Sequence, residues 1–191
     1  NYNTVVGDEA GTAITTGDQN TFVGFDSGKS VNTGIRNVVI GSTAGDALTD
    51  ADYNVVVGQG ALSGDTLGSR STAIGTNTLA VQNFTTATDS YNTAVGYEAG
   101  LSVTTGIRNV LIGGLTGDAL TDADFNVAVG HAALGVDTLG SKSVGVGNGA
   151  LGNQNFTTAT DVFNTAVGTN AGTSVTTGVE NTLVGGLAGD A

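Results

Sequence analysis

The chain has 191 residues, with 32 glycines and no proline, cysteine, methionine or tryptophan. Without cysteine it has no disulfide framework, thiolate metal site or cysteine nucleophile, and its short apolar runs predict no membrane insertion. Seventeen acidic residues against five basic ones give a formal net charge of −12. A phosphate backbone would be repelled, so we expect no nucleic-acid partner.

A motif of the form N-T-x-V-G recurs along the whole chain. The glycines that end it, called marker glycines below, follow one another at steps of 17 residues, apart from two steps of 21. Three short steps and one long step make a 72-residue unit. Residues 20–91 and 92–163 are two copies that share 45 of 72 residues, and 164–191 begins a third. We interpret 1–191 as a single repeat domain and as a fragment of a longer fibre. The marker glycines are Gly7, Gly24, Gly41, Gly58, Gly75, Gly96, Gly113, Gly130, Gly147, Gly168 and Gly185.

Taken in chain order, each unit predicts one β-strand that ends at its marker glycine, followed by a turn such as Thr16-Gly17 or Thr33-Gly34. A 17-residue unit with one β-branched strand is too short for a pair of helices. It fits one coil of a parallel β-solenoid, in which neighbouring coils lie about 4.8 Å apart. The predicted fold is all-β, a rod of about eleven coils and about 50 Å.

Both faces of the predicted strand are apolar. Val or Ile directly precedes every marker glycine, and Thr or Val stands three places before it, on the same face. The position between these two is also apolar in most coils, with Phe22 in the second coil. A strand with two apolar faces is expected to be buried on both sides. One face can fill the coil and the other requires a partner, so we expect a homo-oligomer. Phe22 is assigned to the partner face and Asp26 to the outside.

The N-T-A-V-G-Y-x-A-G wording from Asn92 to Gly100 resembles the repeats of YadA-like heads of trimeric adhesins and, more closely, those of phage tail-fibre proteins. The resemblance covers the entire chain. It implies a left-handed parallel β-roll, a homotrimer and an extracellular place on a virion fibre or bacterial cell surface.

The two 21-residue steps contain the near-identical segments Asn83–Asp89 and Asn155–Asp161. Their four extra residues do not fit a regular coil and are expected to bulge outward, where repeat proteins often bind. One hypothesis is that they contact a host cell-surface glycan or protein. The alternative is that each phenylalanine folds back as a lid on the core. The candidate ligand-binding residues are Phe84, Thr85, Thr86, Phe156, Thr157 and Thr158.

Two acidic segments place three aspartates within seven residues, and such carboxylates can gather around a hard cation such as Ca²⁺. The alternative is a set of solvated turn carboxylates. No other cofactor is indicated. The candidate metal ligands are Asp46, Asp50 and Asp52, with Asp118, Asp122 and Asp124 in the second copy.

Five places before the marker glycines, cations and aromatic rings alternate without a break. Since equivalent residues of adjacent coils lie about 4.8 Å apart, each cation is predicted to lie between two rings. The predicted structural ladder is Arg36, Tyr53, Arg70, Tyr91, Arg108, Phe125, Lys142 and Phe163.

The sequence favours a structural and attachment segment of a trimeric fibre, with a phage tail fibre or virion appendage as first choice. The head of a bacterial surface adhesin is the alternative. No enzyme is expected, because the one histidine, His131, is replaced by Gln59 in the preceding copy. Two further alternatives are an ice-binding solenoid, although the threonine clusters are unevenly ranked, and a depolymerase using Asp50 with Asp52 or Asp122 with Asp124.

Overall fold

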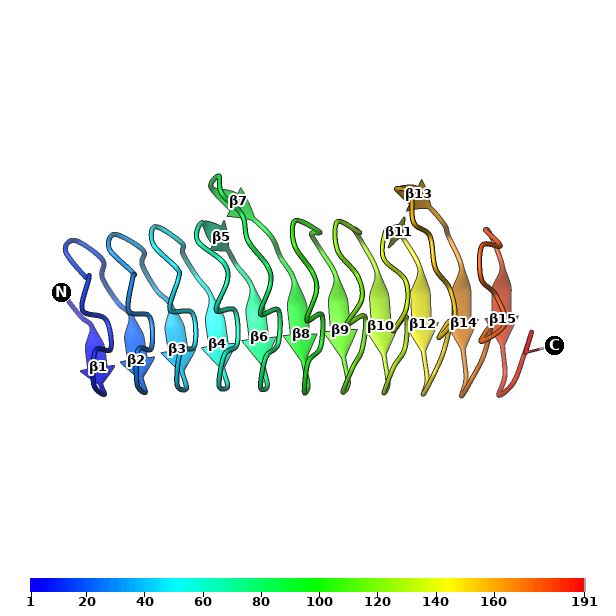
Figure 1. Ribbon diagram of the computed structural model, residues 1–191, viewed down its shortest axis with the longest axis horizontal. Coiled ribbons are helices and arrows are strands. Elements are labelled where there is room, and N and C mark those ends of the chain that lie inside the picture. Colours follow the sequence, from blue (N-terminus) through cyan, green and yellow to red (C-terminus); the bar gives the residue numbers. More distant parts are fainter. Residues whose placement is uncertain (191) are drawn as a thin grey trace.

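Eleven short parallel strands, one from each coil, stack into a single sheet along the computed structural model, which describes residues 1–190 (Figure 1). The described residues contain no helix, so the predicted all-β parallel solenoid is confirmed. They therefore contain no helix that could span a membrane. In stacking order the strands are β1 (Thr4–Val6), β2 (Thr21–Val23), β3 (Val38–Ile40), β4 (Val55–Val57), β6 (Thr72–Ile74), β8 (Thr93–Val95), β9 (Val110–Ile112), β10 (Val127–Val129), β12 (Val144–Val146), β14 (Thr165–Val167) and β15 (Thr182–Val184).

The strands pair in strict register, because equivalent residues of successive coils lie opposite one another. Thr21 of β2, for example, pairs with Thr4 of β1 and with Val38 of β3. The register is kept across the long steps, where β6 pairs with β8 and β12 pairs with β14. Each coil therefore contacts its neighbours in the same way, as in other solenoids.

The long coils add two small parallel sheets at one edge of the rod. β5 (Gly68–Ser69) pairs with β7 (Thr88–Asp89), and β11 (Gly140–Ser141) pairs with β13 (Thr160–Asp161). In Figure 1, β7 and β13 rise above the line of the regular coils. The outward bulge predicted for the long coils is therefore present, and residues 83–89 and 155–161 are called the two arms below.

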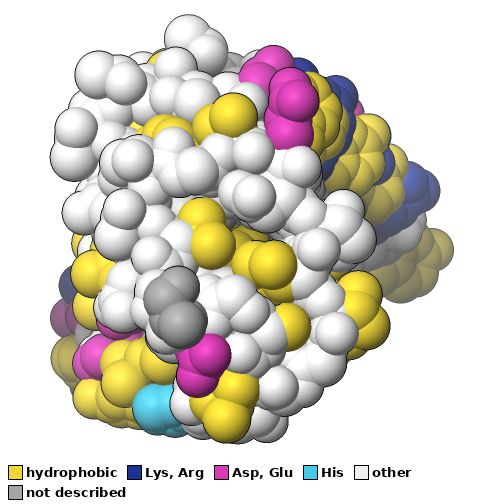
Figure 2. Space-filling model, turned by 90° about the vertical axis from the view of Figure 1, so that its right-hand side faces the viewer, with side chains coloured by type: hydrophobic (Ala, Val, Ile, Leu, Met, Phe, Trp, Pro, Cys, Tyr) yellow, Lys and Arg dark blue, Asp and Glu magenta, His cyan; other side chains and the backbone are white. Residues whose placement is uncertain are grey.

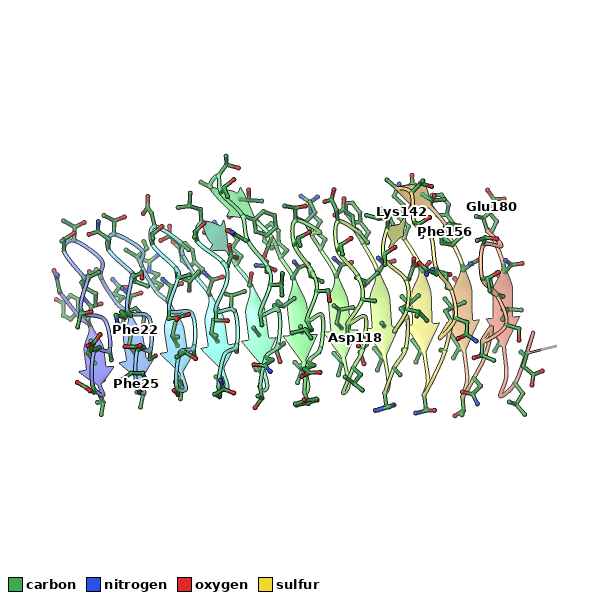
Figure 3. The ribbon with its side chains drawn as sticks, in the orientation of Figure 1. Phe22, Phe25, Asp118, Lys142, Phe156 and Glu180 are labelled. Atoms are coloured by element: carbon green, nitrogen blue, oxygen red, sulfur yellow. The ribbon has the colours of Figure 1, made fainter. Side chains whose placement is uncertain are left out.

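The middle residue of each strand points into the coil, so the assignment of Phe22 to a partner face is wrong. Phe22 has no exposed surface, and Figure 3 shows it within the second coil. The interior is narrow, and equivalent positions carry small buried side chains, such as Ala73 and Ala94. The Val, Ile and Thr residues on either side of the middle residue point outward.

The marker glycines allow the coils to approach closely. Gly24 has a φ of +135°, and a Cβ built on it would lie 2.6 Å from the carbonyl oxygen of Gly41 in the next coil. No side chain fits there without moving the backbone. Adding a side chain would therefore force adjacent coils apart at the end of the strand.

The asparagine that stands four places before most marker glycines is buried and joins adjacent coils. The Asn20 side chain accepts a hydrogen bond from the backbone N–H of Asn37 at 2.8 Å and donates one to the carbonyl oxygen of Gly34 at 2.8 Å. Asn37 repeats the pattern with Asn54 and Ala51. Because an amide supplies both a donor and an acceptor, this column satisfies the backbone groups that a turn leaves unpaired.

Candidate functional site

The described residues enclose no pocket, so the candidate functional features lie on the outer surfaces of the rod. His131 is exposed and its neighbours include the backbone of Gly114. The surfaces that carry distinctive chemistry are the outward face of the sheet, the ladder edge, the two arms and the acidic segments.

The outward face of the sheet consists of two parallel rows of β-branched side chains. The row directly before the marker glycines holds only Val and Ile, and the row three places before them holds only Thr and Val. Val55, Ile40 and Ile112 in these rows are each more than a third exposed. An unbroken face without a charged or bulky residue is unusual for a surface that meets water.

The ladder residues line one edge of the rod, and in Figure 2 dark-blue basic atoms alternate there with yellow apolar ones. The guanidinium carbon of Arg70 lies 4.7 Å from the ring centre of Tyr53 and 5.9 Å from that of Tyr91. The guanidinium carbon of Arg108 lies 6.0 Å from the ring centre of Tyr91 and 5.3 Å from that of Phe125. These distances lie within the range of cation–π attraction.

The ends of the ladder have one ring per cation. The guanidinium carbon of Arg36 lies 5.4 Å from the ring centre of Tyr53. The guanidinium also donates a hydrogen bond to the Tyr53 hydroxyl oxygen at 2.7 Å. The Nζ of Lys142 lies 5.2 Å from the ring centre of Phe163. Among the described residues no such contact joins Lys142 to Phe125, because the ammonium group turns to the Asp161 carboxylate at 2.6 Å.

Every ladder residue has a left-handed backbone, with φ between +51° and +63°. This conformation costs a residue with a side chain about 1 kcal/mol or more. Residue type alone does not predict it, since arginine and phenylalanine are not typical of left-handed positions. Contacts between neighbouring ladder side chains help to offset that cost.

The arms bury their aromatic rings and expose their hydroxyl groups. Phe84 is 5% exposed and Phe156 is 8% exposed, so the rings act as lids on the core and are not offered to a glycan. These two candidate ligand-binding residues are therefore part of the buried hydrophobic core. The other four candidates, the exposed threonines of the arms, are Thr85, Thr86, Thr157 and Thr158.

A buried carboxylate fixes each arm to the coil below it. Asp65 has no exposed surface, and its Oδ1 accepts hydrogen bonds from the backbone N–H groups of Phe84 at 3.0 Å and Gly68 at 3.1 Å. Its Oδ2 accepts one from the side-chain amide of Gln82 at 2.6 Å, and Gln82 in turn accepts one from Asn92. Asp137 and Gln154 form the same network under the second arm.

Sequence reasoning missed this pair of networks, although the chain carries a signal for it. Four places after the marker glycine most coils have Gly, and seven places after it they have an apolar residue, as in Gly45 and Leu48. Next to the arms the order changes to Leu followed by Asp or Gln, as in Leu62 with Asp65 and Leu79 with Gln82. Leucine fills the core from the first position, so the second is free to be polar.

The aspartates of the acidic segments are directed to different neighbours. Asp50 accepts a hydrogen bond from the Thr33 hydroxyl, and Asp52 accepts one from the backbone N–H of Ile35 at 2.8 Å. Asp122 and Asp124 repeat these bonds with the preceding coil.

No group of three or more metal-ligating side chains occurs among residues 1–190. The Ca²⁺ binding predicted for Asp46, Asp50 and Asp52, and for Asp118, Asp122 and Asp124, therefore stays a prediction that no such cluster supports. Asp50 and Asp122, with Asp52 and Asp124, bond within the coil stack, whereas Oδ1 of Asp46 is buried without a hydrogen-bond partner among the described residues.

Two of these aspartates are partly buried and resist ionisation. Burial raises the pKa of Asp46, and the nearby Asp26 carboxylate adds to the effect. Burial likewise raises the pKa of Asp118, with a further contribution from Glu98, while His131 acts in the opposite direction. Figure 3 shows Asp118 away from the edge that carries Lys142 and Glu180.

Comparisons with known proteins add no functional assignment to these surfaces. Scans of the chain against family models, curated proteins and solved structures find no match.

Proposed function

We propose that the chain is a structural and attachment segment of an extracellular trimeric fibre, in first place a phage tail fibre or similar virion appendage that contacts the host surface. Coils that contact only their neighbours make a rod whose length is set by the number of coils. The described residues have no pocket for a substrate, and their distinctive chemistry lies on long outer surfaces. We accordingly propose a spacing and binding role, without catalysis.

The outward face of the sheet is the observation that carries this proposal. Its ten steps of about 4.8 Å and its two side-chain rows give an apolar strip of about 48 Å by about 10 Å, roughly 500 Å² per chain. Three such strips around one axis would bury roughly 1,500 Å² in total, shared among three pairwise contacts. The rows are uniform from end to end, which suits a cyclic assembly of parallel copies. The resemblance to trimeric β-roll heads supports three copies and a left-handed coil.

Light scattering on Val129→Asp tests the assembly. Val129 lies on the outward face of β10, so a carboxylate there would be desolvated in the trimer but tolerated by the isolated rod. We expect three times the chain mass for the unmodified protein and one chain mass for the variant. His131→Asp is the matched control, because it lies two residues further on, off the sheet face, in a column where the first coil has Asp8. A monomeric unmodified protein, or equal dissociation in both variants, would contradict the proposal.

The head of a bacterial trimeric adhesin is the alternative with the same physical basis. Both roles need a stiff trimeric rod with exposed binding features. Flanking domains in the full-length chain distinguish them, since an adhesin carries a stalk and a membrane anchor and a tail fibre carries an attachment to the virion.

Ice binding is a second candidate that one observation favours. Six of the eleven outward residues in the row three places before the marker glycines are threonines. They are aligned along the exposed face of the sheet. The other five are valines, and no threonine occupies the second row. Thermal hysteresis by the monomeric protein, absent in Val129→Asp, would favour ice binding over the fibre.

A further inference from the structure

The two arms frame one interval of the ladder edge. Both arms rise from the same edge of the rod, with lower coils between them (Figure 1). They are separated by 72 residues in sequence, which is four coils or about 19 Å. Between them the edge presents Tyr91, Arg108, Phe125 and Lys142, and the exposed threonines of the arms stand at its two ends.

Arg108 is the one cation of this interval that the described residues leave without an acidic partner. Lys142 is paired with Asp161 of the second arm. On the far side of the first arm Arg70 is paired with Asp89 at 2.9 Å. The arms thus neutralise the ladder cation that precedes each of them. The Arg108 side chain makes no ion pair and no hydrogen bond within residues 1–190, so its five N–H donors are free.

The neighbouring rings prepare Arg108 for a ligand. Tyr91 and Phe125 lie on either side of its guanidinium and are 49% and 43% exposed. A side chain held between two rings loses less freedom on binding than a free one. A guanidinium also matches a carboxylate through two parallel hydrogen bonds.

We propose that the interval between the two arms binds an acidic glycan, with Arg108 holding one sugar carboxylate and the arm threonines contacting neutral sugar hydroxyls. The proposal rests on the attachment role proposed above and names the ligand class that this role would use. An interval of about 19 Å accommodates roughly four sugar units at about 5 Å each, about the spacing of one coil.

The carboxylates around the interval favour a ligand that carries few negative charges. Asp89 and Asp161 lie at the two ends of the interval, and Asp124 lies beside it, bonded to the backbone N–H of Ile107. The chain as a whole carries a net charge of −12. A polyanion with a charge on every unit would meet these carboxylates and be repelled. A chain with one carboxylate among several neutral sugars would place its charge at Arg108 alone.

A panel of immobilised tetrasaccharides tests the proposal, with members that are neutral, that carry one carboxylate, that carry the same acid with its carboxyl reduced to an alcohol, or that carry a carboxylate on every unit. We expect retention of the singly carboxylated members only. Arg108→Gln should weaken that retention about tenfold or more. Arg36→Gln is the matched control, because Arg36 occupies the same place in the preceding 72-residue unit but has an arm on one side only. Circular dichroism and melting curves establish that both variants are folded.

The outcomes separate this proposal from the fibre itself. Retention that is lost in Arg108→Gln and kept in Arg36→Gln supports the site. No retention, equal loss in both variants, or equal retention of neutral or carboxyl-reduced members overturns it. Light scattering on the same samples reports assembly independently, so a trimer that binds no member refutes the glycan site and leaves the fibre role standing. A monomer that retains only the singly carboxylated members would support the glycan site and refute the trimeric fibre.

Discussion

Replacing Arg108 with glutamine tests whether the ladder stabilises the stack of coils. The guanidinium carbon lies 6.0 Å from the Tyr91 ring centre and 5.3 Å from the Phe125 ring centre. An exposed cation–π contact contributes about 0.5–1 kcal/mol, so losing two should lower the free energy of unfolding by about 1–2 kcal/mol. Gln19 occupies the same column with a φ of +59°, against +57° for Arg108, so the substitution adds no new backbone strain.

A double-mutant cycle isolates the contact from other effects of the change. Urea unfolding at one fixed protein concentration would be followed for Arg108→Gln, Phe125→Leu and the combined variant. Leucine is a suitable replacement because Leu62 adopts the same left-handed backbone. We expect a coupling energy of about 0.5–1 kcal/mol between the two sites. A coupling of zero within error would show that the alternation merely follows the repeat.

Four further outcomes follow from the structure. Phe22→Asp should unfold the N-terminal coils, seen as lost circular dichroism, because it buries a charge in the core; dissociation into folded monomers would contradict its inward position. Asp65→Ala should cost about 1–3 kcal/mol and speed hydrogen exchange at the Phe84 amide, since that N–H loses its acceptor; unchanged exchange would exclude the anchoring role. Burial raises the pKa of Asp118 above its usual 3.8, so its ionisation lowers stability as the pH rises through and above that value. Asp118→Asn should therefore melt higher than the unmodified protein at pH 7 and at the same temperature below about pH 3.8; a lower melting temperature at pH 7 would refute the burial effect. Melting curves in chelator and in excess Ca²⁺ should coincide, and a higher melting temperature with Ca²⁺ would instead support the predicted calcium site.

The repeat spacing was sufficient to predict the architecture, because a solenoid converts sequence period directly into coil stacking. The order of the ladder and the outward arms followed from the same counting. The direction of the strand faces did not, because both faces are apolar and alternation alone leaves two choices. Small residues such as Ala73 and Ala94 in the middle of the strand could have decided the point, since a narrow interior accepts them while the outward rows are uniformly β-branched.

The candidate sites were less predictable because they depend on side-chain direction. Three aspartates within seven residues looked like a metal site, yet Asp50 and Asp52 bond to different residues of the preceding coil. Phe84 could have faced outward or inward, and its burial depends on the Asp65 network beneath it, which involves a residue of an earlier coil. Proximity along the chain therefore says little about such sites when the nearest neighbours are 17 residues away.

The alternation of cations and rings also restricts how such a fibre can change in length. The order repeats every two coils, and the 72-residue unit contains four. Recombination between copies that adds or removes whole units preserves every cation–ring neighbour, along with the phase of the arms. Gain or loss of a single coil would place two cations or two rings side by side. Selection for an intact ladder would thus allow the length to change only by even numbers of coils, and a whole unit of four coils adds about 19 Å and one further arm.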